Sequence, residues 1–92
     1  MLEFDKIYEP VPDNPWDAVD DEAVILNMET GHYYSINDVG RFIWEKLDGV
    51  NTLEQILLHV LDAYEVDRET AENDLRQVIE KLVDEKLVRV KE

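Results

Sequence analysis

The side chains that most often carry chemistry in proteins are scarce or scattered in this chain. It has no cysteine and two histidines, His32 and His59, which stand far apart in the sequence. No H-x-x-x-H or H-E-x-x-H pattern is present, so the spacing does not indicate a histidine metal site. The absence of cysteine excludes disulfides, zinc–thiolate sites and a cysteine nucleophile. We expect no metal ion or other cofactor.

Carboxylates are abundant, but their spacing indicates neither a calcium loop nor a catalytic pair. The run Asp17, Asp20, Asp21 and Glu22 lacks the alternation and the central glycine of an EF-hand, and is typical of a solvated loop. No P-loop, G-x-G-x-x-G or G-x-S-x-G motif occurs. With 23 acidic residues among 92, neighbouring carboxylates arise by chance. Catalytic carboxylates need a pocket that perturbs their pKa, and a domain this small has little room for one. We therefore expect a binding protein and no enzyme.

The charge balance restricts the class of partner. The formal net charge is −14, and residues 1–30 alone hold nine acids and one lysine. Nucleic acids and anionic membranes are bound mainly through Lys and Arg, so neither is an expected partner. The chain shows neither an N-terminal signal pattern nor an apolar run of membrane-spanning length, which predicts a cytoplasmic protein.

Three kinds of element must position any binding site. Residues 1–21, with all three prolines in the first 15, form an extended acidic arm, and Leu2, Phe4, Ile7 and Tyr8 could make a first strand within it. Residues 23–28 and 32–36 are rich in strand formers and flank Glu29-Thr30-Gly31, which predicts a β-hairpin. Alternation places His32, Tyr34 and Ile36 on one face of the second strand and Tyr33 and Ser35 on the other.

Three helices are expected after the hairpin, each with its own N-cap: Asn37, Thr52 with Gln55 as a capping box, and Asp67. Apolar residues recur at helical spacing in each, and in the third helix, residues 68–86, the stripe is Ala71, Leu75, Val78, Ile79, Leu82 and Val83. Residues 87–90 either extend the last helix or form a terminal strand. The prediction is an α+β, winged helix-turn-helix-like fold. In it, the arm and hairpin make a three-stranded sheet packed on a three-helix bundle.

Tyr33 and Tyr34 lie on a strand whose outer edge is open in this arrangement. An open edge invites strand addition, with alternate side-chain pockets supplying specificity. Core packing of both tyrosines is the alternative.

An ordered set of residues resembles the PqqD family. The set includes Thr30 to Asn37, then Gly40, Ile43-Trp44, Leu47-Asp48-Gly49 and Thr52, and further on Ile56, Leu61, Tyr64, Val66, Asp74, Leu75, Leu82 and Leu87-Val88. The resemblance covers residues 22–90 and implies a peptide-recognition domain over residues 22–92. Proteins of this family, also called RiPP recognition elements, bind the leader segment of a ribosomally made precursor peptide. They present it to a modifying enzyme, such as a radical SAM protein or a leader peptidase. Small members serve both pyrroloquinoline quinone and lasso-peptide pathways.

The resemblance also implies a binding site between the third strand and the third helix. It suggests Tyr33, Tyr34, Ser35 and Ile36 on the strand, and Ala71, Asp74, Leu75, Val78 and Leu82 on the helix. Asp74 would pair with a basic leader residue or cap a local backbone group. The family often has glycine where this chain has Lys86, which predicts a longer last helical turn.

Two other functions fit the same elements. A winged-helix DNA-binding regulator would use the third helix, but residues 67–86 hold seven acids and four bases. A dimerisation module without a peptide ligand would pair the open strand with its copy. We expect a monomer or a weak dimer.

Overall fold

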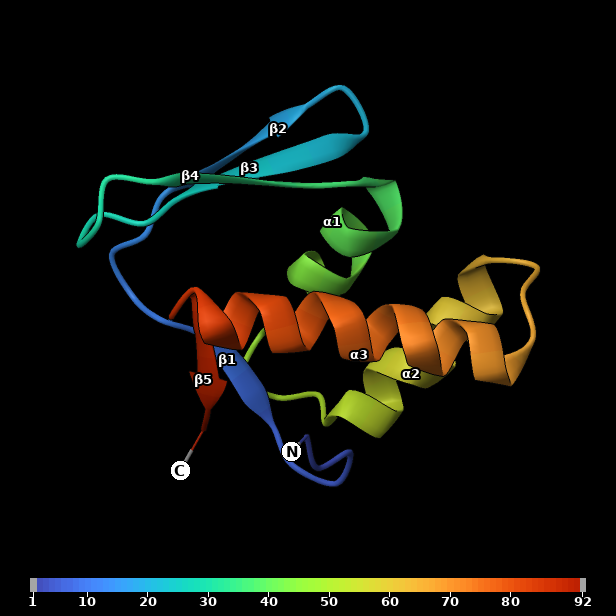
Figure 1. Ribbon diagram of the computed structural model, residues 1–92. Helices are drawn as coiled ribbons and strands as arrows, with labels where there is room; N and C mark the ends of the chain where they lie inside the picture. Colours follow the sequence, from blue (N-terminus) through green and yellow to red (C-terminus); the bar gives the residue numbers. More distant parts are fainter. Residues whose placement is uncertain (1, 92) are drawn as a thin grey trace.

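The computed structural model describes residues 2–91 and consists of three helices and two small antiparallel sheets (Figure 1). In chain order the elements are β1 (Tyr8–Pro10), β2 (Trp16–Val19), β3 (Glu22–Leu26), β4 (Tyr33–Ile36), α1 (Asp38–Lys46), α2 (Leu53–Ala63), α3 (Arg68–Asp84) and β5 (Val88–Val90). The α+β class, the three-stranded sheet and the three helices predicted from the sequence are confirmed.

The larger sheet has the strand order β2-β3-β4. Its hairpin β3–β4 pairs Ile25 with Tyr34, and Gly31 takes φ +77° in the connection. That left-handed conformation is open to glycine without a Cβ penalty, which explains the residue type at this turn. The second hairpin strand begins at Tyr33, one residue later than predicted.

The N-terminal arm contributes strands to both sheets, and this differs from the sequence prediction. The predicted first strand reduces to Tyr8–Pro10, which pairs with β5 at the far end of the chain, while Ile7 forms an isolated bridge with Thr52. The third strand of the larger sheet is instead Trp16–Val19, within the acidic part of the arm. The pairing of β1 with β5 also shows that residues 88–90 form a strand and do not extend α3.

The helices begin at the residues that the capping patterns predict. Asn37 Oδ1 accepts from the N–H of Gly40 at 2.8 Å, and Asp67 Oδ1 accepts from the N–H of Thr70 at 2.9 Å. At the start of α2, Thr52 and Gln55 form a reciprocal capping box. Each cap satisfies N–H groups that a helix leaves without an internal partner.

The last turn of α3 is shorter than the predicted extension to residue 86. The helix ends at Asp84, and Lys86 takes φ +59°. The N–H of Lys86 donates to the carbonyl of Val83, and the N–H of Leu87 donates to that of Leu82 at 2.9 Å. This is the hydrogen-bond pattern of a Schellman motif, which glycine usually completes. Lys86 therefore adopts the conformation that the family's glycine favours.

The core lies between the inner face of the larger sheet and the helices. The largest fully buried side chains are Ile25, Ile43, Leu53, Ile56, Leu57, Leu75, Ile79, Leu82 and Leu87. They come from a strand, from all three helices and from the C-terminal segment, so one core joins the hairpin to the helices. Within residues 2–91, no helix is long and apolar enough to cross a membrane.

Candidate functional site: the edge of β4 beside α3

The outer edge of β4 presents backbone groups that no other strand of residues 2–91 uses, because β4 is the last strand of its sheet. The N–H of Asn27 donates to the carbonyl of His32 at 2.9 Å, two positions from the register pair Ile25 and Tyr34. In an antiparallel ladder every second residue turns both backbone groups to its partner, and the residues between turn theirs away. Tyr33 and Ser35 therefore direct their N–H and C=O groups outward, at the open edge.

The side chains of β4 alternate as the sequence predicts. Tyr34 is partly buried against the core and Ile36 is buried, whereas Tyr33 is 72% exposed and Ser35 is exposed. The two tyrosines thus divide between the two alternatives for them: Tyr34 packs the hairpin and Tyr33 does not. The inner side chains of β4 are directed toward α3 and α1.

A shallow hollow of about 220 Å³ separates β4 from α3. Tyr34 and Ile36 line it from the strand, and Gln77, Val78 and Lys81 line it from the helix. The ammonium group of Lys81 lies 5.5 Å from the centre of the Tyr34 ring. This cation–π contact joins the helix side of the hollow to the strand side. Figure 1 shows β4 above α3, with the chain running in opposite directions along the two elements. We call this open edge and hollow the β4–α3 groove.

The helix side of the groove differs from the sequence prediction. Val78 lines the hollow as predicted, but Ala71, Leu75 and Leu82 are at most 1% exposed and belong to the core beneath it. Asp74 is half-buried outside the lining, and within residues 2–91 its carboxylate caps no backbone group.

Three lining residues were missed, namely Asn37, Gln77 and Lys81. Their signal in the sequence was positional. Gln77 and Lys81 are four positions apart on one face of α3, and Lys81 is three positions after Val78. Asn37 is the N-cap of α1, directly after the strand.

The family model for "Coenzyme PQQ synthesis protein D (PqqD)" matches residues 22–88, which include the whole β3–β4 hairpin and all three helices. This chain belongs to the PqqD family. No curated protein sequence matches the chain.

Two solved structures are similar to this PqqD-family chain. "TbiB1 in Complex with the TbiA(beta) Leader Peptide" is 32% identical with a TM-score of 0.80, and the match covers 88% of this chain and 94% of that one. "Lasso peptide synthetase B1 complexed with the leader peptide" is 22% identical with a TM-score of 0.79, over 90% of this chain and 98% of that one. The second likeness shows the fold alone.

The opposite edge of the sheet is protected, in contrast to β4. On β2, the N–H of Ala18 is satisfied by the carboxylate of Asp17 at 2.9 Å, and acidic residues follow the strand at Asp20 and Asp21. Charged side chains and self-satisfied backbone groups discourage the addition of another strand. At the β2 edge one outward N–H is thus already satisfied, whereas the β4 edge lies beside the hollow.

The shifted ionisable groups of this PqqD-family chain lie outside the groove. The side chain and N–H of Thr70 lower the pKa of Asp67 at the start of α3, and the N–H groups of Val50 and Asn51 lower that of Asp48. Within residues 2–91, no group of three His, Cys, Asp or Glu side chains is placed to hold a metal ion. What the groove offers is hydrogen bonding and apolar contact.

Proposed function

We propose that this PqqD-family chain binds the leader segment of a ribosomally synthesised precursor peptide by strand addition in the β4–α3 groove. The observation that carries the proposal is the open edge of β4 lying directly beside a partly apolar hollow. The complex of the 32% identical TbiB1 with a leader peptide supports the ligand class.

In this proposal the backbone supplies affinity and the hollow supplies selection. An added strand bonds to the outward N–H and C=O groups of Tyr33 and Ser35, as strands do in β-augmentation. A leader side chain that points inward enters the hollow of about 220 Å³ between Ile36 and Val78. Side chains on an added strand alternate, so the inward positions would read the leader at every second residue.

The chain then acts as a non-catalytic adaptor that presents the leader to a modifying enzyme, such as a radical SAM protein or a leader peptidase. We further infer a cytoplasmic monomer or weak dimer in which residues 22–92 form the recognition domain. Its winged helix-turn-helix-like arrangement would serve peptide binding and not DNA binding, because no basic face accompanies it. Acidic residues outnumber basic ones in α3 and its N-cap Asp67, and this supports the inference against DNA binding.

The direct test is an NMR titration of the ¹⁵N-labelled chain with synthetic leaders of precursor peptides encoded beside its gene. We expect saturable shifts at the amides of Tyr33 and Ser35 and along the Gln77–Lys81 face of α3. No perturbation of the β4–α3 groove by any such leader would overturn the proposal. Sedimentation with and without leader tests the alternative that a second copy of the chain occupies the edge of β4. A stable dimer that leader does not dissociate would indicate a dimerisation module.

A further inference from the structure

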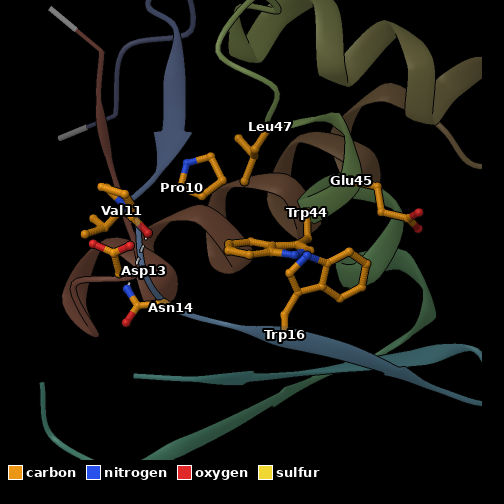
Figure 2. A pocket seen from close by; sticks show the side chains of 9 residues that line it. Pro10, Val11, Asp13, Asn14, Trp16, Trp44, Glu45 and Leu47 are labelled. Atoms are coloured by element: carbon orange, nitrogen blue, oxygen red, sulfur yellow. Dashed lines mark hydrogen bonds between the residues drawn. The ribbon is translucent and has the colours of Figure 1, made fainter. Parts of the chain in front are cut away.

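A second hollow, of about 440 Å³, lies beside β2, at the opposite edge of the larger sheet from the β4–α3 groove. Its apolar walls include Trp16 of β2, Trp44 of α1, Pro10 and Leu47. Figure 2 shows Trp16 rising from the strand to meet Trp44, with the segment that joins β1 to β2 closing the other side. We call it the tryptophan pocket.

Its two indoles form an edge-to-face pair, with ring centroids 6.2 Å apart and planes at 81°. Trp44 is 5% exposed and anchors the pair in the core, whereas Trp16 is 41% exposed. An exposed tryptophan held by a buried one is a rigid aromatic surface, the type of residue enriched at binding hot spots.

The indole N–H of Trp44 has no protein acceptor within residues 2–91. Even so, no buried side-chain nitrogen or oxygen of these residues lacks a partner. The N–H is therefore open to a group from outside rather than sealed in the core. Water or a polar group of a ligand can therefore accept from this N–H.

The rim of the pocket is acidic. Asp13 and Glu45 line it, and no Lys or Arg side chain does. Asp17 follows Trp16 directly, within the 30 N-terminal residues that hold nine acids and one lysine. The β4–α3 groove differs, because its one charged lining residue is Lys81. The two hollows are thus complementary to ligands of different charge.

We propose that the tryptophan pocket docks an arginine-bearing segment of the modifying enzyme, while the leader occupies the β4–α3 groove. The planar guanidinium group of arginine stacks on aromatic faces and pairs with carboxylates. The indoles of the pocket offer the first contact and its acidic rim offers the second. A backbone carbonyl of the same segment would accept from the Trp44 N–H. This proposal rests on the proposed function, because the pocket would contact the enzyme at the β2 edge while the leader occupies the β4 edge.

A first experiment needs no leader and no enzyme. The full-length ¹⁵N-labelled chain gives two indole N–H resonances, one for each tryptophan. The probe is acetyl-Gly-Arg-Gly-Arg-Gly-amide, and the control probe is the same peptide with Glu in place of Arg. We expect saturable shifts of both indole signals with the arginine peptide, little change at Tyr33 and Ser35, and no response to the glutamate peptide. Unmoved indole signals, or equal responses to both peptides, would overturn the proposal.

A second experiment measures binding of the leader-loaded chain to the modifying enzyme encoded beside it. Trp16→Ala should weaken enzyme binding by about tenfold or more, as for a truncated hot-spot residue, and leave leader affinity within about twofold. Val19→Ala is the matched control, since Val19 is 51% exposed on the same strand but lies outside the pocket.

A charge variant keeps the test decisive if Trp16→Ala disturbs the sheet. Asp13→Asn with Glu45→Gln leaves both indoles in place and should weaken enzyme binding and flatten its salt dependence. Unchanged enzyme affinity in this variant contradicts the pocket while leaving leader binding untouched. A wild-type chain that binds no leader would instead contradict the proposed function.

Discussion

The side-chain amide of Asn27 donates a hydrogen bond to the backbone carbonyl of Glu85 at 2.8 Å, across 58 residues of sequence. Its oxygen accepts from the N–H groups of Glu29 at 2.9 Å and Thr30 at 3.2 Å, in the connection between β3 and β4. One buried side chain therefore shapes the turn that precedes β4 and ties it to the C-terminal end of α3. These are the two elements that border the β4–α3 groove.

Replacing Asn27 by alanine should lower the free energy of unfolding by about 2 kcal/mol, because the N–H groups and the Glu85 carbonyl lose their partner. It should also weaken leader binding, since β4 and α3 lose their link. Urea denaturation and leader titration measure the two effects. Asn14→Ala is the control: it also removes an acceptor, for the exposed N–H of Met28, and should cost less than about 1 kcal/mol. Equal costs for the two variants would contradict the central position of Asn27.

Lys86→Gly should stabilise the protein by about 1 kcal/mol. The φ of Lys86 is +59°, a conformation that costs a side-chain-bearing residue free energy and that glycine adopts freely. Lys86→Ala keeps a Cβ and should change stability by less than about 0.5 kcal/mol. Thermal and urea unfolding of both variants check this prediction. A less stable glycine variant would show that the lysine side chain itself supports the end of α3.

Val78→Gln should weaken leader binding by about tenfold, since it places a polar amide in the apolar part of the hollow. Val83→Gln is the matched control, because Val83 is on the same helix, 36% exposed, and outside the groove lining. Isothermal titration with leader distinguishes them, and urea denaturation confirms that both variants fold. Similar affinities for the two variants would place the leader elsewhere.

Leu75→Ala should act through stability, in contrast to Val78→Gln. Leu75 is fully buried, and removing its side chain leaves a core cavity that costs about 2–5 kcal/mol. At a temperature where the variant is still folded, its leader affinity should stay within about threefold of wild type, because it does not line the hollow. A large loss of affinity with little loss of stability would return Leu75 to the binding surface.

Acid should destabilise the loop between α1 and α2 through Asp48. The N–H groups of Val50 and Asn51 lower the pKa of its carboxyl from the ordinary 3.8, so the folded state favours the ionised form. This contribution is present above the unfolded pKa near 3.8 and is lost as pH falls through the lower folded value. Asp48→Asn should lose less stability between about pH 5 and pH 3 than wild type does. An unchanged acid slope in urea denaturation would contradict the link.

The hairpin and the helix starts were predictable because their signals are local. Gly31 between two strand-forming runs defined the turn, and Asn37, Thr52 and Asp67 each precede an apolar stripe at helical spacing. Strand β2 was missed because all four of its residues are exposed and it lies in a segment rich in proline and acid. The β1–β5 pair joins residues about 80 positions apart, as for Glu9 and Arg89, and no local pattern indicates such a pairing.

The helix side of the site shows why a binding surface is harder to predict than a core. The apolar stripe of α3 packs its most apolar residues, Leu75 and Leu82, into the interior. Only Val78, at the edge of that stripe, reaches the groove. Gln77 and Lys81 look like ordinary solvent-exposed helix residues, and only the position of β4 gives them a role. The resemblance to the family indicates which elements border the groove, but the rotation of α3 about its axis decides which of its residues line it.

The measurement that tests strand addition most directly is the leader affinity of Ser35→Pro. The N–H of Ser35 points away from β3, so proline removes an outward donor and places its ring at the edge without breaking the ladder. The account predicts an affinity lower by about tenfold or more, with unfolding free energy within about 1 kcal/mol of wild type. Ser35→Ala, which keeps the N–H, should bind within about twofold of wild type. A folded Ser35→Pro protein that binds leader as tightly as Ser35→Ala would contradict leader binding at the edge of β4.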